Sequence, residues 1–108
     1  MDSTLEALYQ VILDRKANPQ EGSYTCYLFG KGLDKILKKV GEECAETIIA
    51  AKNVRQEETV GEISDLLYHL MVLLADQGIP LDVVLEQLDR RSQKIGNLKH
   101  MKQVDRET

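Results

Sequence analysis

With 108 residues, of which 43% are hydrophobic, the chain is long enough to form one packed domain. Only 5% of the residues are aromatic and there is no tryptophan, so we expect an aliphatic, helical core. The formal net charge of −4 argues against a nucleic-acid-binding surface, which is normally basic.

The N-terminal stretch "MDSTLEALYQ" has neither the basic region nor the apolar region of a signal peptide. No segment further along the chain approaches the roughly 18 apolar residues that cross a bilayer. The two cysteines, Cys26 and Cys44, are too few for a disulfide framework and are expected to be reduced thiols. These features predict a cytoplasmic protein that does not bind a membrane.

Apolar residues at helical spacing predict an all-α fold, a four-helix bundle with helices over about residues 3–15, 32–54, 57–77 and 80–95. The stretch 17–30 contains Pro19 and Gly22, and we interpret it as a long loop between the first two helices. Gly78 is expected to end the third helix, and Pro80 to open the fourth. Residues 1–95 would form one domain, and residues 96–108 a polar tail that frays.

The second helix carries a broad apolar stripe that is expected to face the core. Its members are Ile36, Val40, Cys44, Thr47, Ile48 and Ala51. The stripes are broad for a domain of this size, so part of their surface is expected to pack against another copy of the chain. Gly41 costs this helix about 1 kcal/mol relative to alanine. We attribute it to the close approach of a neighbouring helix, within the chain or in a second copy.

Acidic residues lie at the edges of the apolar faces of the second and third helices. Glu43 and Glu46 border the stripe of the second helix, and Glu42 lies further toward solvent. Glu62 and Asp65 are i, i+3 neighbours at the edge of the third helix. If the two helices are antiparallel, the four carboxylates Glu43, Glu46, Glu62 and Asp65 converge. Such a cluster is relieved by protonation or by a cation, and its oxygen ligands select Mg²⁺, Mn²⁺ or Ca²⁺.

Basic residues follow the same strip, where Lys35 and Lys39 could contact phosphates beside a bound cation. The alternative is a solvated helix face on which Lys39 and Glu43 form an i, i+4 ion pair. His69 is interpreted as a structural hydrogen-bonding residue rather than a metal ligand. Nucleophilic catalysis is not indicated, because Cys44 reads as a core residue and no histidine is placed to activate Cys26.

The motifs "EECAE" and, further on, "EISD" give the pattern E-E-x-x-E … E-x-x-D, which resembles the MazG-like all-α nucleotide pyrophosphohydrolases. The stretches "GSYTCYLFGKGLDKILKKVGEE" and "SDLLYHLMVLL" are similar in particular to the phosphoribosyl-ATP pyrophosphohydrolase family. The resemblance covers about residues 3–90. It implies hydrolysis of a small-molecule nucleotide, phosphoribosyl-ATP, to phosphoribosyl-AMP and pyrophosphate in the second step of histidine biosynthesis. It also implies a homo-oligomer, a dimer or larger.

The resemblance also implies roles for individual residues. The ligands of Mg²⁺, or of Mn²⁺ in its place, would be Glu43, Glu46, Glu62 and Asp65. Either Glu42 or Glu46 would position or deprotonate the attacking water. Substrate contacts would come from Ser23, Tyr24, Thr25, Lys31, Lys35 and Lys39. Two alternatives stay open: a MazG-like pyrophosphatase of ordinary or damaged nucleoside triphosphates, and a helical interaction module without catalytic activity.

Overall fold

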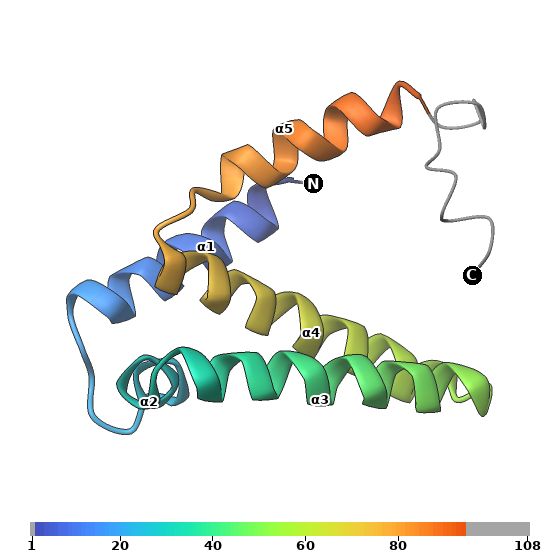
Figure 1. The fold of residues 1–108 in the computed structure, drawn as a ribbon, viewed down its shortest axis with the longest axis horizontal. Coiled ribbons are helices and arrows are strands. Elements are labelled where there is room, and N and C mark those ends of the chain that lie inside the picture. Colours follow the sequence, from blue (N-terminus) through green and yellow to red (C-terminus); the bar gives the residue numbers. More distant parts are fainter. Residues whose placement is uncertain (1, 95–108) are drawn as a thin grey trace.

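The computed structural model describes residues 2–94, which form five α-helices and no strand (Figure 1). Helix α1 spans Asp2–Ala17, α2 Tyr24–Lys31, α3 Leu33–Lys52, α4 Gln56–Gln77 and α5 Leu81–Ser92. The all-α class is confirmed, and the four predicted helices correspond to α1, α3, α4 and α5 with ends within three residues. The predicted polar tail, residues 96–108, lies outside the described residues.

Helix α2 corrects the prediction of a long loop over residues 17–30. Its N-cap is Ser23, whose hydroxyl oxygen accepts a hydrogen bond from the backbone N–H of Cys26 at 3.1 Å. At its other end the N–H of Gly32 donates to the carbonyl of Leu28 at 3.0 Å. Gly32 has a φ of +96°, which favours glycine, and it turns the chain directly into α3.

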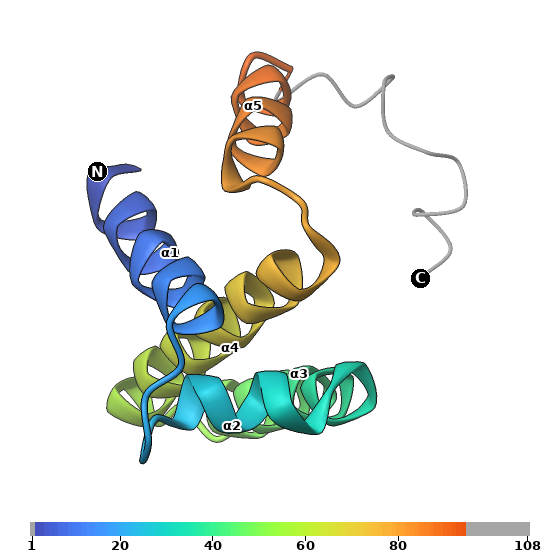
Figure 2. The ribbon, with the colours of Figure 1, turned by 90° about the vertical axis from the view of Figure 1, so that its left-hand side faces the viewer.

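Helices α3 and α4 form a long antiparallel hairpin, which Figures 1 and 2 show from two directions. Each of these helices ends with the same pair of backbone hydrogen bonds, the Schellman arrangement. At the end of α4 it is built around Gly78, with φ +70°, as the sequence predicted. At the end of α3 the same left-handed position is held by Val54, with φ +56°.

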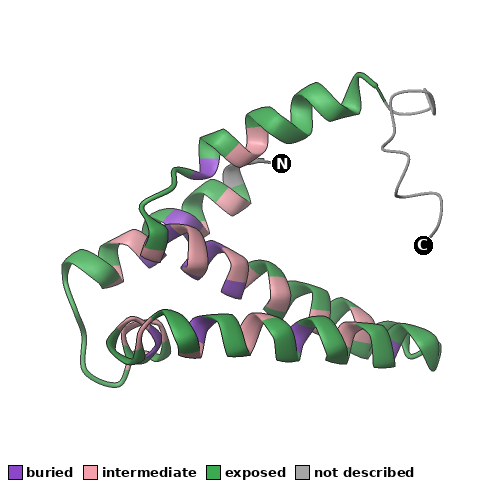
Figure 3. Cartoon of the chain, viewed as in Figure 1, coloured by how far each residue is buried: buried purple, intermediate pink, exposed green. Residues whose placement is uncertain are grey.

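The core lies where α1 and α2 pack against the hairpin, and α5 leads away from it (Figures 2 and 3). The buried cluster consists of Tyr9, Ile12, Leu28, Ile36, Met71, Val72, Ala75 and Leu81. Helix α5 joins this core through Leu81 and Leu85, and most of its remaining surface is exposed. None of the helices among residues 2–94 is long and apolar enough to span a membrane.

The buried face of α3 differs from the predicted apolar stripe. Ile36 is fully buried as expected, but the other buried members are Glu43 and Ala50, at intervals of seven residues. Cys44 is exposed, so its assignment to the core was wrong, and Ile48 is 67% exposed. The stripe therefore contains a second apolar face, which the described part of the chain does not cover.

Candidate active site

Three acidic side chains meet between the two helices of the hairpin. Glu43 of α3 and Glu62 and Asp65 of α4 each offer a carboxylate oxygen, and these oxygens lie within 4.8 Å of one another. The antiparallel pairing of α3 and α4 produces this arrangement, as the sequence predicted. Glu46, the fourth predicted member, is exposed and stands outside this group.

The cluster is partly shielded from water and lacks a compensating donor at its centre. Glu43 is only 6% exposed. The Oε1 atoms of Glu43 and Glu62 are both inaccessible and have no hydrogen-bond partner within residues 2–94. A buried carboxylate oxygen without a donor is costly, so these atoms point to a positive species between them.

The pKa of Glu62 reflects the same crowding of carboxylates. The adjacent carboxyl group of Glu43 raises the pKa of Glu62 to about 7 from its ordinary 4.5, and burial and the charges of Glu46, Glu43 and Asp65 act in the same direction. Glu46 is therefore close enough to the cluster to influence it. A divalent cation would offset the repulsion among these carboxylates.

Lys39 borders the cluster on its α3 side. Its ammonium nitrogen is 3.3 Å from Oε1 of Glu42 and 3.7 Å from Oε2 of Glu43. The hydrogen bond to Glu42 raises the pKa of Lys39, and the charge of Glu43 adds to this. The ion pair expected for a solvated helix face is thus present. A solvated face does not, however, explain why Glu43 is buried.

The other two predicted lysines lie beside an aromatic ring. The ammonium groups of Lys31 and Lys35 are each 5.8 Å from the centre of the Tyr27 ring. Lys31, Lys35 and Lys39 follow one another at intervals of four residues across the junction of α2 and α3. Of the three, Lys39 is the one that reaches the acidic cluster.

The three predicted substrate contacts at the start of α2 have structural partners. Ser23 caps the helix, and the hydroxyl of Thr25 is hydrogen bonded to that of Tyr68. The hydroxyl of Tyr24 lies 2.9 Å from Nε2 of His69. His69 is hydrogen bonded, as the sequence predicted, whereas no role was predicted for Tyr68.

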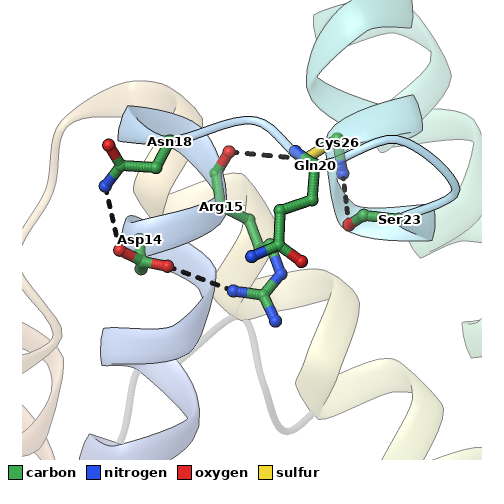
Figure 4. Close-up of polar contacts among 6 residues, drawn as sticks. All are labelled: Asp14, Arg15, Asn18, Gln20, Ser23 and Cys26. Carbon is green, nitrogen blue, oxygen red and sulfur yellow. Dashed lines mark hydrogen bonds and ion pairs between the residues drawn. The ribbon is translucent and has the colours of Figure 1, made fainter.

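The segment that leads into α2 is held to the end of α1, as Figure 4 shows. The backbone N–H of Gln20 donates to Sγ of Cys26 at 3.3 Å, and Cys26 Sγ donates to the carbonyl of Arg15 at 3.4 Å. The Ser23 hydroxyl and the Gln20 N–H lower the pKa of Cys26. These hydrogen bonds hold Ser23 and the start of α2 against the end of α1.

The all-α fold, with carboxylates converging between the two helices of a hairpin, is consistent with a helical pyrophosphohydrolase of the MazG-like class. The chain matches a family described as "Phosphoribosyl-ATP pyrophosphohydrolase" over residues 5–92. It therefore belongs to the phosphoribosyl-ATP pyrophosphohydrolase family, as its motifs indicated.

Similar proteins named phosphoribosyl-ATP pyrophosphatase occur in several bacteria. One from Limosilactobacillus fermentum is 56% identical over 100 residues, which cover 93% of this chain and 94% of the relative. One from Clostridium botulinum (strain Kyoto / Type A2) is 54% identical over 99 residues, 92% of this chain and 90% of the relative. One from Bacillus cereus (strain AH820) is 49% identical over 105 residues, 97% of this chain and 98% of the relative.

Proposed function

We propose that the protein hydrolyses phosphoribosyl-ATP to phosphoribosyl-AMP and pyrophosphate, the second step of histidine biosynthesis. The names of its relatives support this activity. The structural observation that supports it is the pair of buried oxygens of Glu43 and Glu62 beside Asp65, because they have no hydrogen-bond partner among residues 2–94 and a cation would satisfy both. The free thiols of Cys26 and Cys44 suit a reducing cytoplasm, where we place the enzyme.

The donor set fits Mg²⁺, with Mn²⁺ as an alternative. Glu43, Glu62 and Asp65 supply hard oxygen ligands from two helices, and we propose Glu46, whose charge acts on Glu62, as the fourth ligand. A magnesium ion held by few carboxylates keeps positions open for substrate phosphates. When bound, it would neutralise charge on the triphosphate and on the leaving pyrophosphate.

The chain's own residues then have separate tasks. The lysine row Lys31, Lys35 and Lys39 binds phosphate oxygens, and Lys39 exchanges its ion pairs with Glu42 and Glu43 for them. One of the two exposed carboxylates, Glu42 or Glu46, orients the attacking water or accepts its proton. Ser23, Tyr24 and Thr25 hold the phosphoribosyl end at the start of α2.

The test is magnesium-dependent release of pyrophosphate from phosphoribosyl-ATP, dCTP and dUTP. We expect Glu43→Gln and Asp65→Asn to lower activity by about a hundredfold or more while circular dichroism stays helical, because each removes a cation ligand. Glu57→Gln is the matched control, since Glu57 is an exposed acidic residue of α4 outside the cluster.

Each other outcome of this assay has a defined meaning. Faster turnover of dCTP or dUTP than of phosphoribosyl-ATP would identify a nucleoside triphosphate pyrophosphatase instead. Retained activity in both variants would refute the ligand assignment. Absence of pyrophosphate release from every nucleotide would leave a helical interaction module.

We also propose that the enzyme is a homodimer, built on an outer face of the hairpin. This outer face consists of Leu37, Gly41, Cys44 and Ile48 of α3 and Val60, Gly61, Ile63 and Leu67 of α4. Leu37, Ile48, Val60, Ile63 and Leu67 are between 43% and 67% exposed. On α3 the spacing of the face is that of a coiled-coil seam. A side-chain carbon added at Gly41 or Gly61 would meet no described atom within 4 Å, so a second copy has room to approach.

We propose a second copy of the chain as the partner of this outer face, because a two-fold axis brings the same face of two copies together. The open space at Gly41 also excludes the close approach of another described helix of the same chain as the reason for this glycine. We expect sedimentation to give a dimer for the wild type and a monomer for Ile48→Lys. Val83→Lys, at an exposed position of α5, is the control. A monomeric wild type at micromolar concentration would refute the dimer.

A further inference from the structure

His69 is a buried polar side chain of α4 that the proposed chemistry leaves without a task. It is 4% exposed and lies one helical turn after Asp65. Its Nδ1 is 2.7 Å from the backbone carbonyl oxygen of Asp65, and its Nε2 is 2.9 Å from the hydroxyl of Tyr24. The ring thus joins the helix of the acidic cluster to the first residue of α2.

The direction of these two hydrogen bonds follows from the atoms involved. A carbonyl oxygen can only accept, so Nδ1 of His69 carries the hydrogen that it donates to Asp65. In the neutral ring Nε2 is then an acceptor, and the hydroxyl of Tyr24 donates to it. Burial raises the pKa of Tyr24, which keeps this hydroxyl protonated. The hydrogen bond of His69 to the Asp65 carbonyl therefore sets the tautomer of the ring, and this tautomer orients the hydroxyl of Tyr24 toward Nε2.

A neighbouring pair of side chains repeats the connection. Thr25, next in α2, is hydrogen bonded through its hydroxyl to Tyr68, which precedes His69 in α4. The Tyr24 ring meets the His69 ring edge-on, with centres 5.7 Å apart, and lies beside the Tyr68 ring at 6.2 Å. Two consecutive residues of α2 are therefore held by two consecutive residues of α4.

Tyr24 is also within electrostatic range of the charged groups of the site. The charge of Lys39 lowers the pKa of its hydroxyl, and the charge of Glu43 raises it. A shift of Tyr24 would thus move the start of α2 relative to the lysine that borders the acidic cluster. Ser23 and Thr25 would move with it.

We propose that His69 is a positioning residue, which holds Tyr24 and through it the start of α2 at a set distance from the cation-binding helix. The inference rests on the proposed function, in which Ser23, Tyr24 and Thr25 contact the substrate. His69 itself touches neither cation nor substrate. Its contribution is to keep the substrate-binding segment in place before the substrate arrives, which lowers the entropy lost on binding.

Two substitutions separate the two hydrogen bonds of His69. His69→Asn keeps an amide N–H near the Nδ1 position and loses the acceptor that faces Tyr24. His69→Gln instead places an amide oxygen near the Nε2 position. We expect His69→Asn and Tyr24→Phe each to raise KM for phosphoribosyl-ATP about three- to tenfold, with kcat within about twofold, because both loosen binding rather than chemistry. His69→Gln should return KM to within about twofold of the wild type.

A double variant tests whether His69 acts through Tyr24. Once Tyr24→Phe has removed the donor, adding His69→Asn should raise KM no further. The dissociation constant for Mg²⁺ should be unchanged in all variants, because none of them replaces a proposed ligand. Independent, additive effects of His69→Asn and Tyr24→Phe would overturn the proposal.

Tyr9→Phe is the matched control for a merely structural effect. It removes a tyrosine hydroxyl that donates to the carbonyl of Ile79 at 2.6 Å, about 20 Å along α4 from Asp65. We expect it to lower the melting temperature and leave KM unchanged. If His69→Asn and Tyr24→Phe behave in the same way, or if His69→Gln fails to restore KM, His69 is a core residue only and the proposal is wrong.

Amide hydrogen exchange decides the question independently of turnover. We expect the α2 amides to exchange faster in His69→Asn than in His69→Gln or the wild type, with α3 unchanged. Equal α2 exchange in all three proteins would overturn the proposal. A wild type that fails to hydrolyse phosphoribosyl-ATP would refute the proposed function alone. The comparison of amide exchange would still test whether His69 holds α2 in place.

Discussion

The raised pKa of Glu62 makes magnesium binding dependent on pH in a range where an ordinary carboxylate would not. With a pKa of about 7, the side chain is about 90% protonated at pH 6 and about 10% at pH 8. A cation needs the ionised form, so its apparent dissociation constant should rise about tenfold from pH 8 to pH 6. Isothermal titration of Mg²⁺ into the substrate-free protein at pH 6, 7 and 8 measures this change.

The sign of the effect on stability follows from the same proton. Between the ordinary pKa of 4.5 and about 7, the folded, metal-free protein keeps a proton on Glu62 that the unfolded chain releases. The metal-free protein should therefore lose stability as the pH rises through this range. The stabilisation of the folded protein by a fixed concentration of Mg²⁺ should increase over the same range. At the higher pH Glu62 is already ionised, so the cation has no proton to displace.

Glu62→Gln is the decisive variant, because it removes the titrating group and keeps its size. It should bind Mg²⁺ more weakly than the wild type at pH 8 and show little change in affinity between pH 6 and pH 8. Glu57→Gln, outside the cluster, should keep the tenfold change. A wild-type affinity that stays within about twofold over this range, or a Glu62→Gln variant that keeps the tenfold change, would refute the reasoning.

Two further predictions concern the ends of helices. Val54→Gly should raise the free energy of unfolding by about 0.5–1 kcal/mol, because it relieves a β-branched residue at φ +56° by more than the entropy that glycine adds to the unfolded chain. Val54 is 88% exposed, so no packing is lost, and a lower urea midpoint would contradict this account. Ser23→Ala should lower the free energy of unfolding by about 1 kcal/mol through loss of the α2 cap. Ser23→Thr should keep most of it, and an equal loss in both variants would show that the cap is not responsible.

Periodicity alone located the long helices but not the short one. Helices α1, α3, α4 and α5 have apolar residues at helical spacing over three turns or more, and this periodicity is the strongest indication of a helix in a sequence. Helix α2 has only eight residues, three of them aromatic, and it follows Pro19 and Gly22. The usable signal was Ser23, a good N-cap three residues before the backbone N–H that it binds.

The sequence predicted the carboxylate cluster of the hairpin but not the contacts that hold α2 to α4. Spacing along α3 and α4 sufficed to bring Glu43, Glu62 and Asp65 together, because antiparallel helices with acidic edges allow few other arrangements. The contacts of Tyr24 with His69 and of Thr25 with Tyr68 join residues more than 40 positions apart. No local pattern encodes such a pairing, so it required the tertiary structure.

The two apolar faces of α3 explain why its core was misassigned and why the acidic cluster lies where it does. Periodicity shows that a residue avoids water but not whether its own chain or a second copy covers it. Ile36 and Ala50 lie on the buried side of α3, whereas Ile48 lies on the outer face. Glu43 lies between Ile36 and Ala50 on the buried side of α3, where an ionised carboxylate is costly unless a positive group pairs with it. Glu43, which the sequence placed at the edge of the apolar stripe, is therefore the buried member of the acidic cluster. Because Glu62 beside it loses its proton as the pH rises, the pair then favours a bound cation over a proton.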